Sequence, residues 1–84
     1  MIIQKNNSVC INKRGRFIDG TITDISIALT PSDPAGENGV QVEQLDIDMN
    51  YKGSISYKTN NDQEYWAYFD QIVEVDGLPR TGDI

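Results

Sequence analysis

Histidine is absent from the 84-residue sequence, and cysteine occurs only once, as Cys10. Because histidine is the commonest general base and metal ligand, its absence removes the residue on which most active sites and metal centres depend. Cys10 has no imidazole partner, so we expect it to pack as a small hydrophobic residue between Val9 and Ile11. The sequence therefore predicts a protein that is not an enzyme and that has no catalytic residues, no bound metal and no cofactor.

Long apolar runs are also missing. No segment approaches the roughly 18 consecutive apolar residues needed to span a bilayer, and the short run Met1–Ile3 is followed at once by polar residues. A single cysteine cannot form an internal disulfide, which is typical of a reducing compartment. We therefore expect a cytoplasmic protein without a membrane partner.

Lysine and arginine are absent from residues 17–51, which carry seven acidic residues, and the net charge of the chain is −6. Such a charge repels phosphate groups, with a local exception at Lys13, Arg14 and Arg16. These three bases lie in a polar segment that contains Gly15, which is typical of a turn. We interpret it as a solubilising turn, and the alternative is a contact with nucleic-acid phosphates.

The sequence is instead rich in short alternating runs of β-branched and aromatic residues, which favour strands. No stretch keeps a helical period for long, and the one helix-like element expected is a single tight turn at residues 70–72. A long exposed loop is expected at 30–39, and shorter turns at 12–16, 50–53 and 60–62. The expected strands are 8–11, 21–29, 40–49, 54–59, 63–69 and 73–75.

In two of these strands the apolar residues shift from one face of the strand to the other. In the first, Ile25, Ile27 and Leu29 share one face, whereas Ile22 falls on the other. A bulge near Asp24 reconciles the two sets. A similar change of parity within 40–49 predicts a second bulge at 43–44. Bends of this kind allow a small sheet to curve and close on itself.

A chain of this length removes only roughly 60% of its unfolded surface from water, so its core must be thin. We expect a single domain over residues 1–84, with a core at about 8–76 and a frayed tail at 77–84. Five or six short strands leave few open edges when they form one closed or nearly closed barrel. The sequence therefore predicts an all-β fold.

The segments FIDGTI at residues 17–22 and EYWAYFDQIVEV at 64–75 carry a family resemblance. The first is similar to the entry into a strand of SH3-like small β-barrels, and the second resembles the aromatic strand, one-turn helix and closing strand that end them. The resemblance implies a five- or six-stranded barrel that binds other macromolecules, although fold alone does not fix function. The long acidic segment 31–48 departs from compact members of the family. Short acidic chains of this kind also resemble accessory proteins of bacteriophages or marine bacteria.

Large aromatic residues crowd the strand expected at 63–69. Alternation places Tyr65, Ala67 and Phe69 on one face and Trp66 and Tyr68 on the other. The rings cannot all be central in so small a core. We expect the first set to be buried and the second set to reach the surface.

The exposed set forms the candidate partner-binding patch, which consists of Trp66 and Tyr68 together with Tyr51 and Tyr57. Rings of this kind supply a large contact area at a low cost in side-chain entropy. Two alternatives remain, because packing explains most aromatic residues. In the first, both faces of the sheet are covered within one chain, and in the second, a homodimer buries the rings.

Asp46, Asp48 and Asn50 alternate like the first ligands of a calcium-binding loop. The match fails because Tyr51 stands where such a loop needs glycine and Tyr57 stands where it needs a bidentate glutamate. We interpret the three residues as the solvated face of a strand and expect no metal site there.

The leading hypothesis is a non-enzymatic binding or adaptor domain that recognises a protein partner through exposed rings flanked by acidic residues. The second is a nucleic-acid-associated barrel that uses the basic turn 13–16. The third is a structural subunit that self-associates into a homo-oligomer through an edge strand or the aromatic face. Light scattering at several concentrations separates the third hypothesis from the first.

Overall fold

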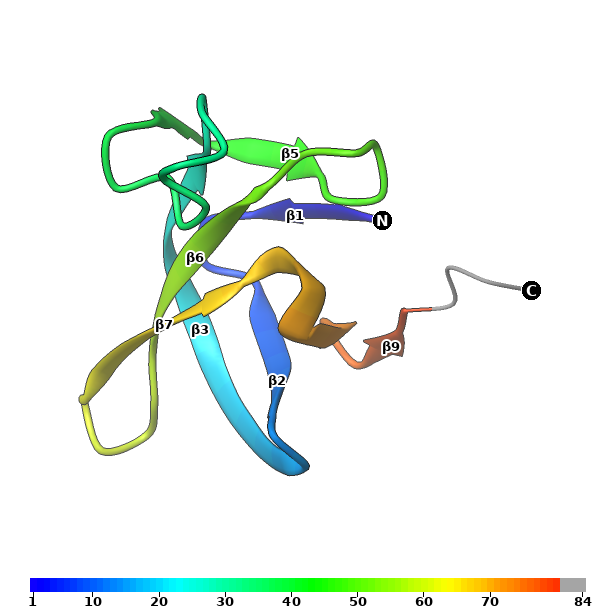
Figure 1. The fold of residues 1–84 in the computed structure, drawn as a ribbon. Helices are drawn as coiled ribbons and strands as arrows, with labels where there is room; N and C mark the ends of the chain where they lie inside the picture. Colours follow the sequence, from blue (N-terminus) through cyan, green and yellow to red (C-terminus); the bar gives the residue numbers. More distant parts are fainter. Residues whose placement is uncertain (81–84) are drawn as a thin grey trace.

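The computed structural model describes residues 1–80, and it consists of short β-strands joined by turns (Figure 1). Strands account for 55% of these residues and none of them is α-helical, which confirms the all-β class. Over the same residues, no helix has the length and apolar character needed to cross a membrane. The elements in chain order are β1 (Ile2–Gln4), β2 (Ser8–Lys13), β3 (Arg16–Ile27), β4 (Val40–Val42), β5 (Gln44–Asp46), β6 (Gly53–Lys58), β7 (Glu64–Tyr68), the one-turn 3-10 helix η1 (Phe69–Gln71), β8 (Ile72–Val75) and β9 (Leu78–Pro79).

The strands form one large antiparallel sheet and one small one. The large sheet has the strand order β7-β6-β3-β2-β8-β9, and β4 also belongs to it because it pairs with β3. The small sheet consists of β1 and β5. β3 is long enough to pair with β2 along its first part and with β6 along its second part (Figure 1). The hydrogen-bonded order is open at β7 and β9. A closed barrel therefore stays a prediction.

A bulge bends β3 at its middle. The pairing of β3 with β6 shifts register between Ile22 and Asp24. Ile22 and Ile25 differ in parity, yet both are fully buried. The bulge predicted near Asp24 is therefore confirmed, and it turns both parts of the long strand toward the same core.

The segment expected as one strand at 40–49 consists of two strands, so that prediction is wrong. β4 pairs with β3, whereas β5 pairs with β1 in the small sheet. The chain changes partner at Glu43, so the change of parity marks a break between sheets rather than a bulge. Met49, beyond the end of β5, is 64% exposed. The sequence also did not predict β1, which buries Ile3 completely and extends the core to the amino end.

The core is built from the inward-facing side chains of both sheets. Its largest fully buried members are Tyr57 and Phe69. Each buried isoleucine contributes roughly 1.5–3 kcal/mol relative to leaving it in water. The remaining core residues are Ile3, Val9, Ile11, Ile22, Ile25, Leu45, Ile47, Ile55, Ala67, Ile72 and Val75.

Tyr57 and Tyr65 exchange the places that the sequence predicts for them. Tyr57 is fully buried, and Tyr65, expected in the core, is 46% exposed. The two residues are directly opposite one another on β6 and β7, with ring centroids 6.0 Å apart. β6 lies between two strands, whereas β7 is at the edge of the sheet. The ring on the inner strand occupies the core, and the ring on the edge strand lies next to it and stays partly exposed.

The carboxyl-terminal part of the described chain folds back onto the sheet. The tight turn expected at 70–72 is present as η1, and β9 then pairs with β8 through a turn at Asp76 and Gly77. The guanidinium of Arg80 donates hydrogen bonds to the carbonyl of Phe69 at 2.6 Å and to the carboxylate of Asp48 at 3.0 Å. Residues 77–80 are therefore held in place rather than frayed. The rest of the expected tail, 81–84, lies outside the described residues.

Candidate functional site

Two exposed rings lie side by side on the edge strand β7. Trp66 is 49% exposed and Tyr68 is 37% exposed. Their ring centroids are 5.0 Å apart and the rings meet edge to face, at an interplanar angle of 79°. This geometry is a favourable one for an aromatic pair. Ala67 points to the opposite side and is buried, so the strand is anchored in the core while both rings face solvent.

Small polar side chains continue this face across the sheet. Ser54 is paired with Tyr68 on one side and with Ser26 on the other, and Ser56 is paired with Trp66. Because serine side chains are short, they form a low polar floor beside the two rings. The contrast in side-chain size makes Trp66 and Tyr68 one wall of a groove.

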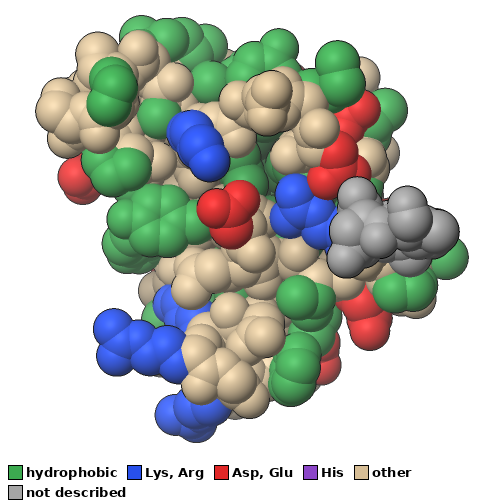
Figure 2. Space-filling view, turned by 45° about the vertical axis from the view of Figure 1, so that its right-hand side comes forward, with side chains coloured by type: hydrophobic (Ala, Val, Ile, Leu, Met, Phe, Trp, Pro, Cys, Tyr) green, Lys and Arg blue, Asp and Glu red, His purple; other side chains and the backbone are tan. Residues whose placement is uncertain are grey.

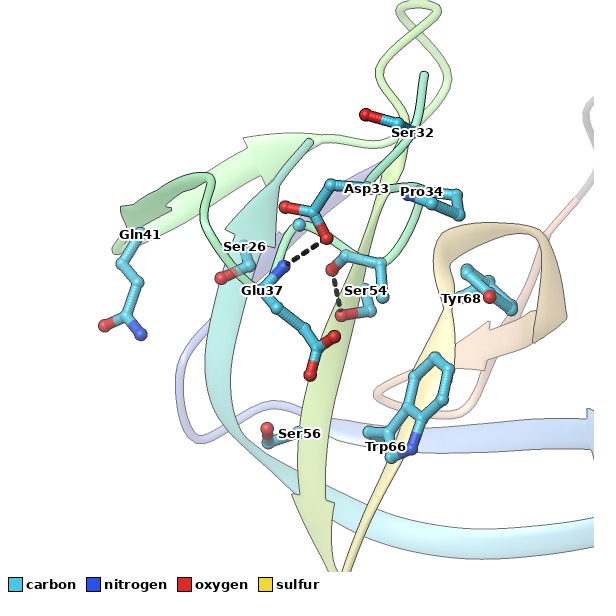
Figure 3. A pocket seen from close by; sticks show the side chains of 12 residues that line it. Ser26, Ser32, Asp33, Pro34, Glu37, Gln41, Ser54, Ser56, Trp66 and Tyr68 are labelled. Atoms are coloured by element: carbon cyan, nitrogen blue, oxygen red, sulfur yellow. Dashed lines mark hydrogen bonds between the residues drawn. The ribbon is translucent and has the colours of Figure 1, made fainter. Parts of the chain in front are cut away.

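The loop at residues 28–39 forms the opposite wall (Figure 3). The carboxylate of Asp33 accepts hydrogen bonds from the backbone N–H groups of Glu37, at 3.0 Å, and Asn38, at 2.8 Å. The hydroxyl of Ser54 donates to the carbonyl of Ala35 at 2.6 Å and ties the loop to β6. The loop is exposed, as the sequence predicts, but these bonds hold it against the sheet.

Rings, serines and loop together enclose an open groove of about 640 Å³. Glu37 reaches from the loop over the floor, with its carboxylate on the side of Trp66 (Figure 3). None of the described residues that line the groove is a lysine or an arginine. An acid and an exposed indole around one space form a favourable environment for a cation.

The other two tyrosines of the predicted patch lie elsewhere. Tyr57 is buried in the core, so its assignment as a partner-binding residue is wrong. Tyr51 is 44% exposed but lies behind the loop, where it shares a smaller hollow of about 250 Å³ with Pro34 and Tyr68. Of the four residues, the structure brings Trp66 and Tyr68 together in the groove and places Tyr51 next to them. The contribution of Glu37 was not predicted from the sequence.

The basic turn lies at the tip of the β2–β3 hairpin. Arg14 and Gly15 both have positive φ, at 54° and 88°, and the side chain of Asn12 accepts the N–H of Gly15 at 2.8 Å. This is the geometry of a two-residue hairpin turn. Figure 2 shows basic side chains projecting together at the end of the molecule where this hairpin ends. Phe17, next to the turn, is 68% exposed.

Lys13 differs from the two arginines of the turn because it bends over the sheet. Its Nζ atom lies 5.8 Å from the ring centroid of Tyr57 and 5.7 Å from that of Tyr65. Both distances are within the range of a cation–π interaction. Arg14 and Arg16 are exposed, and they are the basic groups of the turn that are accessible to a phosphate.

Asp46 and Asp48 contact cations of the protein itself. The ammonium group of Met1 donates to Asp46 at 3.0 Å and to Asp48 at 2.6 Å. The ammonium group and then Arg80 hold the pKa of Asp48 below its usual value. For Asp46 the backbone N–H of Asp48 is the main cause of a lowered pKa, followed by the ammonium group. Across residues 1–80, no three side chains of the kind that bind metals lie close enough to hold an ion.

Cys10 lies on the outer face of β2, between two core residues. It is half-buried and is paired with Asp19 on β3 and with Glu74 on β8. Burial, followed by the charge of Asp19, raises the pKa of its thiol. The thiol is therefore protonated and is a poor nucleophile at neutral pH.

No protein-family model matches the chain, and no curated protein or solved structure matches it significantly.

Proposed function

We propose that this domain is a non-enzymatic protein-binding module that holds a lysine- or arginine-containing segment of a partner protein in the groove beside Trp66. The observation that carries the proposal is the pairing of two exposed rings, Trp66 and Tyr68, with the carboxylate of Glu37 across one open groove. Exposed aromatic residues in a groove are the residues that most often dominate binding at protein interfaces.

Charge complementarity identifies the kind of partner. The groove contains Glu37 and Asp33, and lysine and arginine are absent from its described lining. A cationic side chain that enters this space meets the face of an indole and a carboxylate together. The net charge of −6 adds a long-range attraction for a basic segment at low ionic strength.

We also propose that the fold is an SH3-like barrel. The pairing of β2 with both β3 and β8 and the one-turn helix that joins β7 to β8 support this assignment. These are the parts of the chain in which the sequence resembles that family. The assignment agrees with a binding role but does not determine the ligand.

The test is a titration of a fluorescently labelled octapeptide of alternating lysine and threonine, followed by fluorescence anisotropy. Trp66→Ala removes the indole and is expected to weaken binding by about tenfold, the typical loss at an interface hot spot. Glu37→Gln keeps the shape of the side chain and is expected to weaken binding by about threefold, with a smaller dependence on salt. Phe17→Ala is the matched control, because it removes an exposed ring that does not line the groove.

Equal binding by the wild type and the Trp66→Ala protein would contradict the proposal. So would tighter binding of a peptide in which glutamate replaces lysine. Light scattering on the wild type at several concentrations addresses self-association, and a dimer whose rings are inaccessible to the peptide would favour a structural subunit instead.

A second candidate function is nucleic-acid binding by the β2–β3 hairpin. The observation that favours it is the exposure of Phe17 beside Arg14 and Arg16 at the tip of the hairpin. A ring and two cations are suited to a base and its neighbouring phosphates. Titration with single- and double-stranded oligonucleotides at low salt is the test. Binding that is lost in Arg14→Gln and Phe17→Ala but kept in Trp66→Ala would support this function, and no binding at low salt would exclude it.

A further inference from the structure

The groove continues to an open edge of the sheet. Among residues 1–80, β7 pairs with β6 alone and is the last strand on its side of the large sheet. Its pairing with β6 is regular, without a register shift from Ser54–Tyr68 to Lys58–Glu64. The main-chain groups on the other side of β7 therefore have no neighbouring strand among the described residues.

The antiparallel pattern determines which groups face this edge. The N–H of Thr59 donates to the carbonyl of Gln63 at 3.0 Å, so these residues form a hydrogen-bonded pair. Hydrogen-bonded and non-hydrogen-bonded pairs alternate along an antiparallel ladder. Glu64, Trp66 and Tyr68 therefore direct their main-chain N–H and C=O groups away from β6. The N–H of Tyr68 is taken by the side-chain carbonyl of Gln71 at 3.0 Å.

The edge of β7 has few of the features that usually prevent a strand from pairing. Proline, lysine and bulges are common protections at sheet edges, and β7 has none of the three. At the other end of the sheet, β9 is a two-residue strand that contains Pro79. β7, with five residues, is the longer of the two open ends of the large sheet.

The chain segment that carries this edge is acidic, although Lys58 on β6 lies opposite Glu64 and Lys13 lies over the ring of Tyr65. Residues 59–79 contain five acidic residues and no lysine or arginine. Glu64 begins β7 and Asp70 follows its end, and both are exposed. A basic extended segment is complementary to this edge, whereas a second copy of the acidic strand is not.

We propose that the partner segment binds as an extra antiparallel strand along β7, with lysine or arginine at alternate positions on the face of Trp66 and Tyr68. This proposal rests on the proposed function, because it concerns the same groove and the same basic partner. A segment residue opposite Trp66 then exchanges two main-chain hydrogen bonds with it and places its side chain beside the indole. Main-chain bonds supply affinity in this mode, and the alternating side chains supply specificity.

Backbone N-methylation of the octapeptide of alternating lysine and threonine tests the mode directly. In the proposed arrangement the lysine amides face β7 and the threonine amides face solvent. Methylation of the lysine amides is expected to weaken binding by about tenfold or more, since it removes donors and adds bulk at the interface. Methylation of the threonine amides leaves side chains, charge and the interface edge unchanged and is expected to have little effect.

A pair of variants at Glu64 tests the same mode from the protein side. Glu64→Pro removes an N–H that faces the open edge, at the first residue of a strand, where proline is tolerated. Glu64→Gln keeps the N–H and removes only the charge. We expect the proline variant to bind at least about fivefold more weakly than the glutamine variant. Far-ultraviolet circular dichroism checks that both proteins are folded.

The outcomes distinguish this proposal from the proposed function. If Trp66→Ala weakens binding but the two methylated peptides bind equally, the groove binds the segment without strand addition, and the inference is wrong. If methylation of the lysine amides matters but Trp66→Ala does not, strand addition stands and the role of the indole is wrong. If the wild type does not bind the peptide, both proposals fail.

Discussion

The hydroxyl group of Tyr57 gives the sharpest test of the core. Tyr57 is fully buried, and its Oη atom has no hydrogen-bond partner among the described residues. A buried hydroxyl without a partner costs about 1–3 kcal/mol. Tyr57→Phe removes this oxygen and keeps the ring that fills the centre of the core. Because the phenyl ring leaves only a small void, we expect the free energy of unfolding to rise by about 1 kcal/mol.

The assay is thermal and urea unfolding of the wild type and the variant. A gain of about 1 kcal/mol in a domain of this size raises Tm by about 4–8 °C. In urea, the midpoint is expected to increase at an unchanged m-value, because the surface exposed on unfolding stays the same. Peptide binding is expected to be unchanged, since the ring does not reach the groove.

Tyr65→Phe is the matched control. Tyr65 lies directly opposite Tyr57 and is 46% exposed, so its hydroxyl group can be hydrated. We expect its removal to change stability by less than about 0.5 kcal/mol. A loss of stability in Tyr57→Phe, or equal effects in the two variants, would refute the reasoning, because the buried hydroxyl would then make a stabilising bond.

Two further predictions concern glycine substitutions and the stability of the protein at acidic pH. A Cβ atom on Gly39 would overlap the carbonyl oxygen of Ile27, whereas one on Gly15 meets nothing within 4 Å. We therefore expect Gly39→Ala to lower the free energy of unfolding by about 3 kcal/mol, and Gly15→Ala by about 1 kcal/mol, from its positive φ alone; equal losses would contradict this. The lowered pKa of Asp48 stabilises the folded protein above the pKa of an unfolded aspartate, and this contribution is lost as the pH falls through the folded value. The free energy of unfolding of the Asp48→Asn protein should therefore decrease less than that of the wild type as the pH falls, as measured by urea unfolding at a series of acidic pH values.

Alternation along the chain was enough to predict the all-β class and the bend in β3. Ile22 and Ile25 cannot share a face of a regular strand, so a bulge between them follows from the sequence alone. The same pattern within 40–49 has two physical explanations, a bulge or a change of partner strand. The sequence does not distinguish them, because pairing of β5 with β1 joins segments about forty residues apart.

Exposure of the aromatic residues depended on strand order, which is not a local property. Tyr57 and Tyr65 carry the same side chain on adjacent strands, and the one on the inner strand β6 is buried whereas the one on the edge strand β7 is exposed. Trp66 and Tyr68 were predicted on the exposed face from the alternation of the strand, which places them opposite the set expected in the core. Glu37 was not predicted as part of the groove, since its position depends on the bonds that Asp33 and Ser54 make to the loop.

The most direct test of the central claim is nuclear magnetic resonance mapping of the labelled protein during titration with the octapeptide of alternating lysine and threonine. The claim that a basic segment occupies the groove predicts the largest amide shifts at Trp66, Tyr68 and Glu37, with a shift of the indole N–H. Shifts confined to the β2–β3 hairpin, or none at saturating peptide, would contradict it.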